Sequence, residues 1–247
     1  MINYYFMVCE SLHEKRTKPL YNTVIKKIKE NGDNFYLLGG FETTDELPII
    51  KVCDLDDYSS CVEKTESIFR RDWSSTDWHM ICDDDTFVHT DNLNSFISTL
   101  SEDNLRIYCS KISEKKVGIY GGAGILFNNK TFKFIKKYVE KNGWRENRYL
   151  QTHSDVALED MCYLINRKTK VVNNKNEKIR ISYPNTMYGL NYETISPRLF
   201  KNGRNSIKVE VKKDLISAHI KDLKYMWPDF NGNECPYKSL YNAFCKS

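Results

Sequence analysis

Three consecutive carboxylates, Asp83, Asp84 and Asp85, directly follow an apolar segment in the stretch WHMICDDDTFVHTDNL. Neighbouring carboxylates repel one another, so a partner has to offset that cost. A hard divalent cation such as Mn²⁺ or Mg²⁺ prefers oxygen ligands and often shares its coordination with waters or substrate phosphates. The alternative is an acidic surface turn that caps the following helix. The apolar residues on both sides of the triplet favour the metal site.

Three later segments also contain residues suited to chemistry. A glycine cluster in YGGAGILFNN, at 120–129, would let the backbone approach a ligand closely, although a tight turn is an equally simple explanation. In HSDVALEDMCYL, at 153–164, a carboxylate near a helix start could take a proton from a hydroxyl, or could simply stabilise the helix N-terminus. His219 in ISAHI could be a metal ligand beside a carboxylate, or a hydrogen-bonded core histidine.

Length and composition indicate a globular protein with a small-molecule site. The chain has 247 residues, of which 40% are hydrophobic and 28% charged, which is too apolar for a disordered chain. Its 37 basic and 33 acidic residues give a net charge of +4, and the lysines are scattered in small groups, as on solvated surfaces. We therefore expect no nucleic-acid partner, whereas a modest positive balance suits a phosphate-bearing ligand. No apolar run reaches about 18 residues, so we expect no membrane span in this chain.

The eight cysteines favour a reduced, intracellular protein. The spacings Cys53–Cys61 and Cys235–Cys245 would each allow a bridge. No CxxC pair is present, so we expect no structural zinc site. Cys9, Cys82 and Cys109 lie in apolar, strand-like runs, which is typical of small buried thiols.

Strand and helix patterns alternate through the first two thirds of the chain. Strands are expected at 3–9, 35–40, 48–53, 78–82, 105–110 and 117–128. Helices are expected at 18–30, 59–71, from Thr90 or Asp91 as cap to about 100, at 130–141 before Gly143, and at 154–166. Short strands are expected in VVNN (171–174), IRISY (179–183) and SIKVEV (206–211). The pattern predicts one α/β domain with a mostly parallel sheet, helices on both faces and an irregular C-terminal portion.

The stretch WHMICDDDTFVHTDNL resembles the DxD region of the fringe-type β-1,3-glycosyltransferases and the core-1 galactosyltransferase, one family of inverting enzymes. The shared features are a tryptophan, a hydrophobic strand, the acidic triplet, an aromatic residue, a valine and DNL. YGGAGILFNN resembles the family's GGAG block, HSDVALEDMCYL its EDV or DDV block, and ISAHI a late histidine block. FMVCESLHEKR resembles the family's first strand and its His/Arg-rich turn, so the resemblance spans roughly residues 3 to 225.

The resemblance implies a GT-A fold, a Rossmann-like mixed sheet flanked by helices, over one domain at 1–247. Its nucleotide-binding part would span about 1–110 and its acceptor-binding part about 111–247. The implied metal ligands for Mn²⁺ (or Mg²⁺) are Asp85 and His219. The implied donor-binding residues are Asp83, Asp84, Glu10, Arg16, Lys64, Gly121, Gly122 and Gly124.

The implied catalytic base is Asp155, with Asp160 as the alternative. The alternative arises because Ser154 replaces the family's usual acid and Glu159 its usual glycine, so that EDM at 159–161 offers a second alignment. Trp144 and Trp227 are candidates to stack on sugar rings, with core packing as the simpler explanation.

The function expected from these features is metal-dependent, inverting transfer of a hexosyl or N-acetylhexosaminyl group from a nucleotide-diphosphate sugar, most simply a UDP-sugar. The acceptor would be a hydroxyl of a glycan, protein or lipid. One alternative is a GT-A protein that binds carbohydrate or nucleotide without catalysis. Another is a metal-dependent nucleotidyl or phosphoryl transferase, which also uses clustered aspartates. Because no anchor precedes the first strand, we expect a cytoplasmic protein. The sequence is rich in lysine, asparagine and isoleucine, as an AT-rich genome encodes, which suggests viral or host-cell cytoplasm. The secretory lumen is the alternative if an anchor has been removed.

Overall fold

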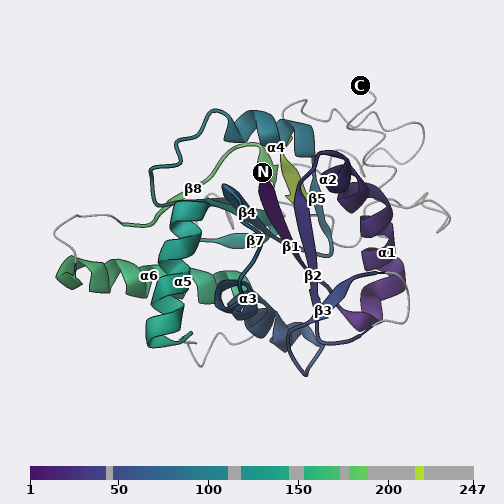
Figure 1. The fold of residues 1–247 in the computed structure, drawn as a ribbon, viewed down its shortest axis with the longest axis horizontal. Helices are drawn as coiled ribbons and strands as arrows, with labels where there is room; N and C mark the ends of the chain where they lie inside the picture. The colour runs from purple at the N-terminus through teal and green to yellow at the C-terminus, as the bar shows by residue number, and fades with distance from the viewer. Residues whose placement is uncertain (43–46, 111–117, 145–152, 173–177, 189–214, 220–247) are drawn as a thin grey trace, which may run out of the picture.

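The computed structural model describes residues 1–42, 47–110, 118–144, 153–172, 178–188 and 215–219, and the fold below is that of these residues (Figure 1). A seven-stranded sheet forms its centre, in the order β3-β2-β1-β4-β7-β6-β8. The strands are β1 (Ile2–Met7), β2 (Asn34–Gly39), β3 (Ile49–Lys51), β4 (Trp78–Asp83), β6 (Arg106–Ser110), β7 (Tyr120–Asn128) and β8 (Arg180–Ser182).

Strand direction makes the sheet mixed, as the resemblance implies. β1, β2, β3 and β4 run parallel to one another, and β8 runs parallel to β6. β7 lies antiparallel to both β4 and β6. The start of β7 therefore lies at the same edge of the sheet as the ends of β1 and β4. This mixed, Rossmann-like α/β arrangement confirms the predicted fold class.

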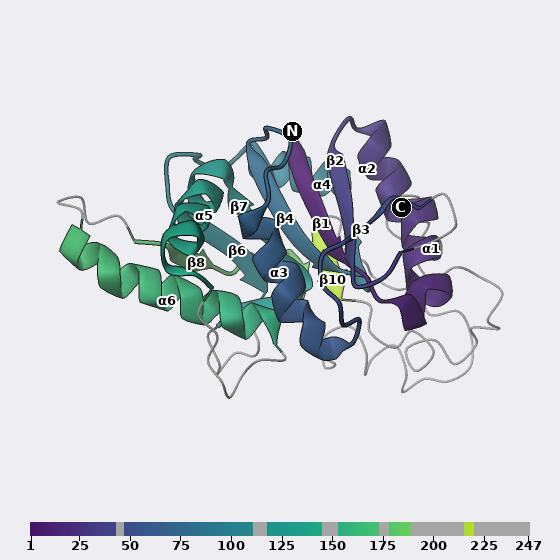
Figure 2. The same cartoon turned by 60° about the horizontal axis from the view of Figure 1, so that its bottom comes forward.

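Two helical layers cover the two faces of the sheet (Figures 1 and 2). On one face lie α1 (Lys18–Leu20), which continues through a π-helical stretch into α2 (Lys26–Glu30), and α4 (Thr90–Ile97). On the other face lie α3 (Cys61–Arg70), α5 (Asn129–Asn142) and α6 (Ser154–Val172). Alternate residues of β1 face opposite layers, so Tyr4 and Phe6 belong to one hydrophobic core and Tyr5 and Met7 to the other. No helix among the described residues is long and apolar enough to cross a membrane.

A second, three-stranded sheet joins distant parts of the chain. It consists of β5 (Thr86–Val88), β10 (Ser217–His219) and β9 (Met187–Tyr188), in the order β5-β10-β9. β10 pairs antiparallel with β5, and His219 lies opposite Thr86. The segment before β10 is also held, because the backbone N–H of His89 donates to the Ile216 carbonyl over 2.8 Å.

Several local predictions were wrong. The N-cap of α4 is His89, whose Nδ1 accepts from the Asn92 backbone N–H, rather than Thr90 or Asp91. The first two residues of VVNN continue α6 as helix, since the apolar period of that helix extends further than expected. SIKVEV lies outside the described residues. Cys53 and Cys61 are both free thiols, so their bridge is not formed, and the Cys235–Cys245 pair lies outside the described residues.

Buried His79 makes the stability of the sheet depend on pH. Its ring stacks on Phe132 with centroids 4.0 Å apart, and its Nδ1 lies 2.9 Å from the Tyr5 hydroxyl. Burial lowers the pKa of His79 from about 6.5 to about 4. The folded state therefore keeps the ring neutral at pH values where the unfolded chain protonates it.

We predict that His79 lowers the free energy of unfolding as the pH falls from 6.5 to 4, because the unfolded state then binds more protons than the folded state. The loss at pH 4 should be about 3 kcal/mol, given about 1.4 kcal/mol per pKa unit. Urea unfolding at several pH values should show a shallower dependence for His79→Gln than for the wild type. Parallel dependences in the two proteins would contradict the prediction.

Candidate functional site

A cavity of about 560 Å³ opens at the edge where β1 and β4 end and β7 begins. This volume lies in the range of small-molecule sites. The cavity is lined by side chains from eight separate segments, including Cys9, Ser11, Arg16, Asp56, Asp57, Lys64, Asp83, Asp84, Asp85, Tyr120, Gly121, Gly122, Ser154, Asp155 and His219. The acidic triplet, the glycine pair, the helix-start aspartate and the late histidine therefore share one cavity.

Arg16 is the charged partner of the triplet. Its Nη1 lies 3.0 Å from Asp84 Oδ1 and 2.9 Å from Asp85 Oδ2. On the other side of Asp85, Oδ1 lies 3.2 Å from His219 Nε2. Asp85 thus stands between a guanidinium and an imidazole, which offset the repulsion from the neighbouring carboxylates.

The remaining repulsion still affects protonation. Burial, followed by the charge of Asp85, raises the pKa of Asp84 to about 7, against the opposing effect of Arg16. Burial and the charges of Asp85, Asp84 and Asp155 raise the pKa of Asp83 well above its usual value. Both shifts arise because these carboxylates are buried in the cavity wall and lie close to one another.

His219 is held tightly in place. The β5–β10 pairing brings it to the triplet, and the Tyr120 hydroxyl lies 3.1 Å from its Nδ1, which leaves Nε2 directed at Asp85. A Cβ at Gly122 would lie 2.6 Å from His219 Nδ1, a separation that two such atoms cannot adopt. Only glycine at 122 therefore allows the ring to lie in this position.

Asp155 lies beside the other glycine of the pair. Its Oδ2 accepts a hydrogen bond from the Gly121 backbone N–H over 3.1 Å, and its Oδ1 accepts one from Val156 over 2.8 Å. These two bonds fix a carboxylate at the start of α6, on the cavity wall. The neighbouring Glu159 faces elsewhere, because its Oε2 accepts from the Ile119 N–H and anchors the start of β7.

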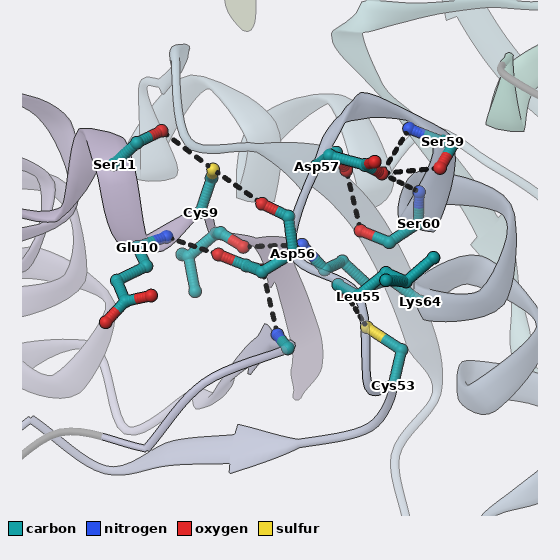
Figure 3. Close-up of polar contacts among 12 residues, drawn as sticks. Cys9, Glu10, Ser11, Cys53, Leu55, Asp56, Asp57, Ser59, Ser60 and Lys64 are labelled. Atoms are coloured by element: carbon teal, nitrogen blue, oxygen red, sulfur yellow. Dashed lines mark hydrogen bonds and ion pairs between the residues drawn. The ribbon is translucent and has the colours of Figure 1, made fainter.

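Lys64 lines the cavity and also has a structural role. Its ammonium group is buried, 2.8 Å from the Val8 carbonyl and 2.7 Å from Asp56 Oδ1 (Figure 3). The Asp56 carboxylate also accepts the backbone N–H groups of Glu10 and Gly40. Although burial acts in the opposite direction, these hydrogen bonds hold the pKa of Asp56 below its usual value. Lys64 therefore fixes the cavity wall, and its charge is neutralised there.

Four other predicted residues lie away from the cavity. Gly124 packs in the core at φ +85°, where a Cβ would lie 2.5 Å from Met80 Cε. Trp144 stacks on Phe69 with centroids 5.9 Å apart. Asp160 is on α6 but not among the lining residues, and the exposed Glu10 contributes its backbone N–H rather than its carboxylate, which points away from Asp56 in Figure 3. Trp227 lies outside the described residues.

Three contributors were missed from the sequence: Tyr120, Thr86 and Asp56. The Thr86 hydroxyl accepts from the Asp83 N–H and donates to the Gly122 carbonyl, each over 3.0 Å, and so joins the triplet to the glycine pair. Tyr120 and Thr86 directly adjoin predicted motifs, which was the available signal. Asp56 had none, because its partners, the Lys64 ammonium and the backbone N–H groups of Glu10 and Gly40, lie in other segments.

The donor set is suited to a divalent ion that is shared with a ligand. Within the described residues no group of three His, Cys, Asp or Glu side chains forms a complete metal site. Asp85 and His219 nevertheless offer an oxygen and a nitrogen 3.2 Å apart, in a cradle that a Cβ at position 122 would fill. A carboxylate and an imidazole suit Mn²⁺, with phosphate oxygens and water as its remaining ligands.

Comparison with known proteins finds similarity only at the level of structure. No protein-family model matches the chain, and no curated protein matches it. A glycosyltransferase involved in glycosylation of the major capsid of the virus PBCV-1 is 12% identical, with a TM-score of 0.47, over 89% of this chain and 93% of its own. The galactosyltransferase LgtC, in complex with donor and acceptor sugar analogues, is 12% identical, with a TM-score of 0.44, over 89% and 87%.

A third similar structure is a mutant of β1,4-galactosyltransferase 7 from Drosophila in complex with manganese, UDP-Gal and xylobiose. It is 12% identical, with a TM-score of 0.38, over 74% of this chain and 65% of its own. None of the three is described as a fringe-type enzyme, so they do not support that narrower resemblance. Similarity this distant assigns no activity, and the proposal below rests on the chain's own residues.

We predict that Gly122→Ala displaces the His219 ring from Asp85, because the new methyl group would overlap the imidazole. A crystal structure or the imidazole NMR signals of His219 would show the displacement. Gly121→Ala is the matched control, since its Cβ would lie 3.3 Å from Asp155 Cβ and needs only a small shift. An unmoved ring in Gly122→Ala would contradict the prediction.

Proposed function

We propose that the chain is a metal-dependent glycosyltransferase that moves a sugar, with inversion, from a nucleotide-diphosphate donor to an acceptor hydroxyl. The proposed donor is a UDP-sugar. We further propose that the fold is of the GT-A type and that the chain is related to the fringe-type family. The part up to about residue 110, with Arg16 and the triplet, would bind the nucleotide. The later part, with Asp155, would face the acceptor.

One observation carries this proposal: four blocks that lie far apart in the sequence line the same cavity. The triplet, Gly121–Gly122, Asp155 and His219 are separated by up to about 65 residues from one block to the next, yet all are lining residues. Taken one at a time, the triplet could be a surface acidic turn, the glycine pair a tight turn and Asp155 a helix-stabilising charge. Their convergence on one cavity is not explained by those separate roles.

Each residue has a definite chemical task in this proposal. Asp155 would accept the proton of the acceptor hydroxyl, whose oxygen bonds to the anomeric carbon as the carbon–oxygen bond to the diphosphate breaks. Asp85 and His219 would hold the divalent ion, which when bound stabilises negative charge on the departing diphosphate. Burial of Asp84 and Asp85 in the cavity wall would strengthen these electrostatic effects.

Asp155 is a better candidate for the base than Asp160. Asp155 lines the cavity with Asp85, and its charge contributes to the raised pKa of Asp83. Asp160 follows on the same helix but is not a lining residue. Binding without catalysis and phosphoryl transfer remain the competing functions, and both would leave UDP-sugars intact.

We predict that UDP and Mn²⁺ together raise the melting temperature, because a ligand that binds only the folded state stabilises it. Asp85→Asn should abolish this shift in melting temperature, since it removes the negative charge that holds the ion. Asp103→Asn, in an exposed loop, makes the same change of charge outside the cavity and should behave as wild type. An undiminished shift in Asp85→Asn would exclude Asp85 as the metal ligand.

We predict that Asp155→Asn keeps UDP and Mn²⁺ binding but lowers the turnover number by about 10²- to 10⁴-fold, the usual contribution of a general base. Hydrolysis of a panel of UDP-sugars measures turnover without a known acceptor, because water then takes the acceptor's place. Asp160→Asn is the matched control and should retain activity. The reverse pattern would transfer the role of base to Asp160, and no hydrolysis by the wild type with any donor would favour a binding protein.

A further inference from the structure

The cavity lining described by the structure includes two basic side chains, Arg16 and Lys64, and they are held very differently. Lys64 is buried, with 2% of its side chain exposed, and is tied to Val8 and Asp56. Arg16 has 27% of its side chain exposed and contacts the triplet through one nitrogen, Nη1. Of the two, Arg16 has the more exposed side chain, and its contacts with the triplet are ones that a ligand could replace.

The Arg16 guanidinium forms an ion pair with Asp85, the carboxylate proposed to bind the metal. It lies 2.9 Å from Asp85 Oδ2, and His219 lies on the side of Oδ1. A divalent ion bound to Asp85 would bring two further positive charges next to the guanidinium, and like charges at such separations repel strongly where water is scarce. The ion and Arg16 therefore compete for the same carboxylate.

A displaced Arg16 needs a new anionic partner. The planar guanidinium matches a phosphate group better than a lysine ammonium does, because its donors form a fork. In the proposed function the diphosphate lies at the metal and so within the same cavity. A metal ion that arrives alone disrupts the Arg16 ion pairs, whereas one that arrives with a diphosphate offers Arg16 a replacement.

We propose that Arg16 is an internal counter-ion of the ligand-free site, which the metal displaces and the diphosphate recaptures, so that each ligand binds weakly without the other. This inference rests on the proposed function. The coupling is mutual: if the nucleotide tightens metal binding, the metal tightens nucleotide binding by the same factor. Arg16 is thus a positioning residue that couples two ligands.

The test is a titration of the protein with Mn²⁺, followed by the EPR signal of the free ion, with and without UDP. In the wild type, UDP should tighten Mn²⁺ binding by about tenfold or more, within the usual range of such couplings. Arg16→Gln should bind Mn²⁺ alone at least about fivefold more tightly than the wild type, because the competitor is gone. The same variant should lose most of the tightening by UDP.

Two control variants separate this effect from net charge and from misfolding. Lys15→Gln removes the same charge from the neighbouring, exposed position and should behave as wild type. Arg16→Lys keeps the charge but replaces the fork by a single ammonium, and its affinity for Mn²⁺ alone should lie between those of wild type and Arg16→Gln. Melting curves without ligand identify any variant that does not fold.

The outcomes distinguish this inference from the function on which it rests. If the wild type binds Mn²⁺ only with UDP but both Arg16 variants bind Mn²⁺ alone no more tightly than the wild type, Arg16 is not the competitor. If the wild type shows the predicted coupling through Arg16 but hydrolyses no UDP-sugar, the coupling stands and the transferase assignment fails. If the wild type binds no Mn²⁺ even with UDP, both fail together.

Discussion

Electrostatic repulsion among carboxylates grows as water is excluded, and β4 delivers Asp83, Asp84 and Asp85 into the wall of a cavity. Two basic side chains from opposite ends of the chain contact these carboxylates. Arg16 comes from the helical stretch that follows β1, and His219 from a strand more than 130 residues after the triplet. Three carboxylates thus lie beside one guanidinium and one imidazole, and burial followed by their mutual repulsion raises the pKa of Asp83 and Asp84. The arrangement therefore favours a further cation.

The small sheet determines where His219 can lie. Backbone pairing sets His219 opposite Thr86, one residue after the triplet, so the imidazole position depends on strand register. Thr86 in turn bonds to both the triplet and Gly122 through its hydroxyl. A shift of one residue in that register would turn His219 to the other face of the sheet. The position of His219 in the site therefore depends on the pairing of β5 with β10, two strands of three residues each.

Much of the fold could be predicted because its signals are local. Apolar runs and helical spacing located the strands and helices of both cores, and Gly143 marked the end of α5. Interactions between distant residues were harder to predict. Lys64 was expected to bind the donor on account of its position, but its ammonium is neutralised by Asp56, a partner that no local pattern indicates. Gly124 belongs to a glycine-rich motif, yet tight packing against Met80 explains it.

The Asp56 carboxylate has a consequence for redesign of the protein. It joins the turn after β1, the end of β2 and the start of α3, through Glu10, Gly40 and Lys64. One carboxylate therefore holds these three segments together beside the cavity, of which Asp56 and Lys64 are lining residues. Remodelling the cavity for a bulkier or smaller guest should begin at Ser11, which lines it without bonding to Asp56, and leave the junction itself intact.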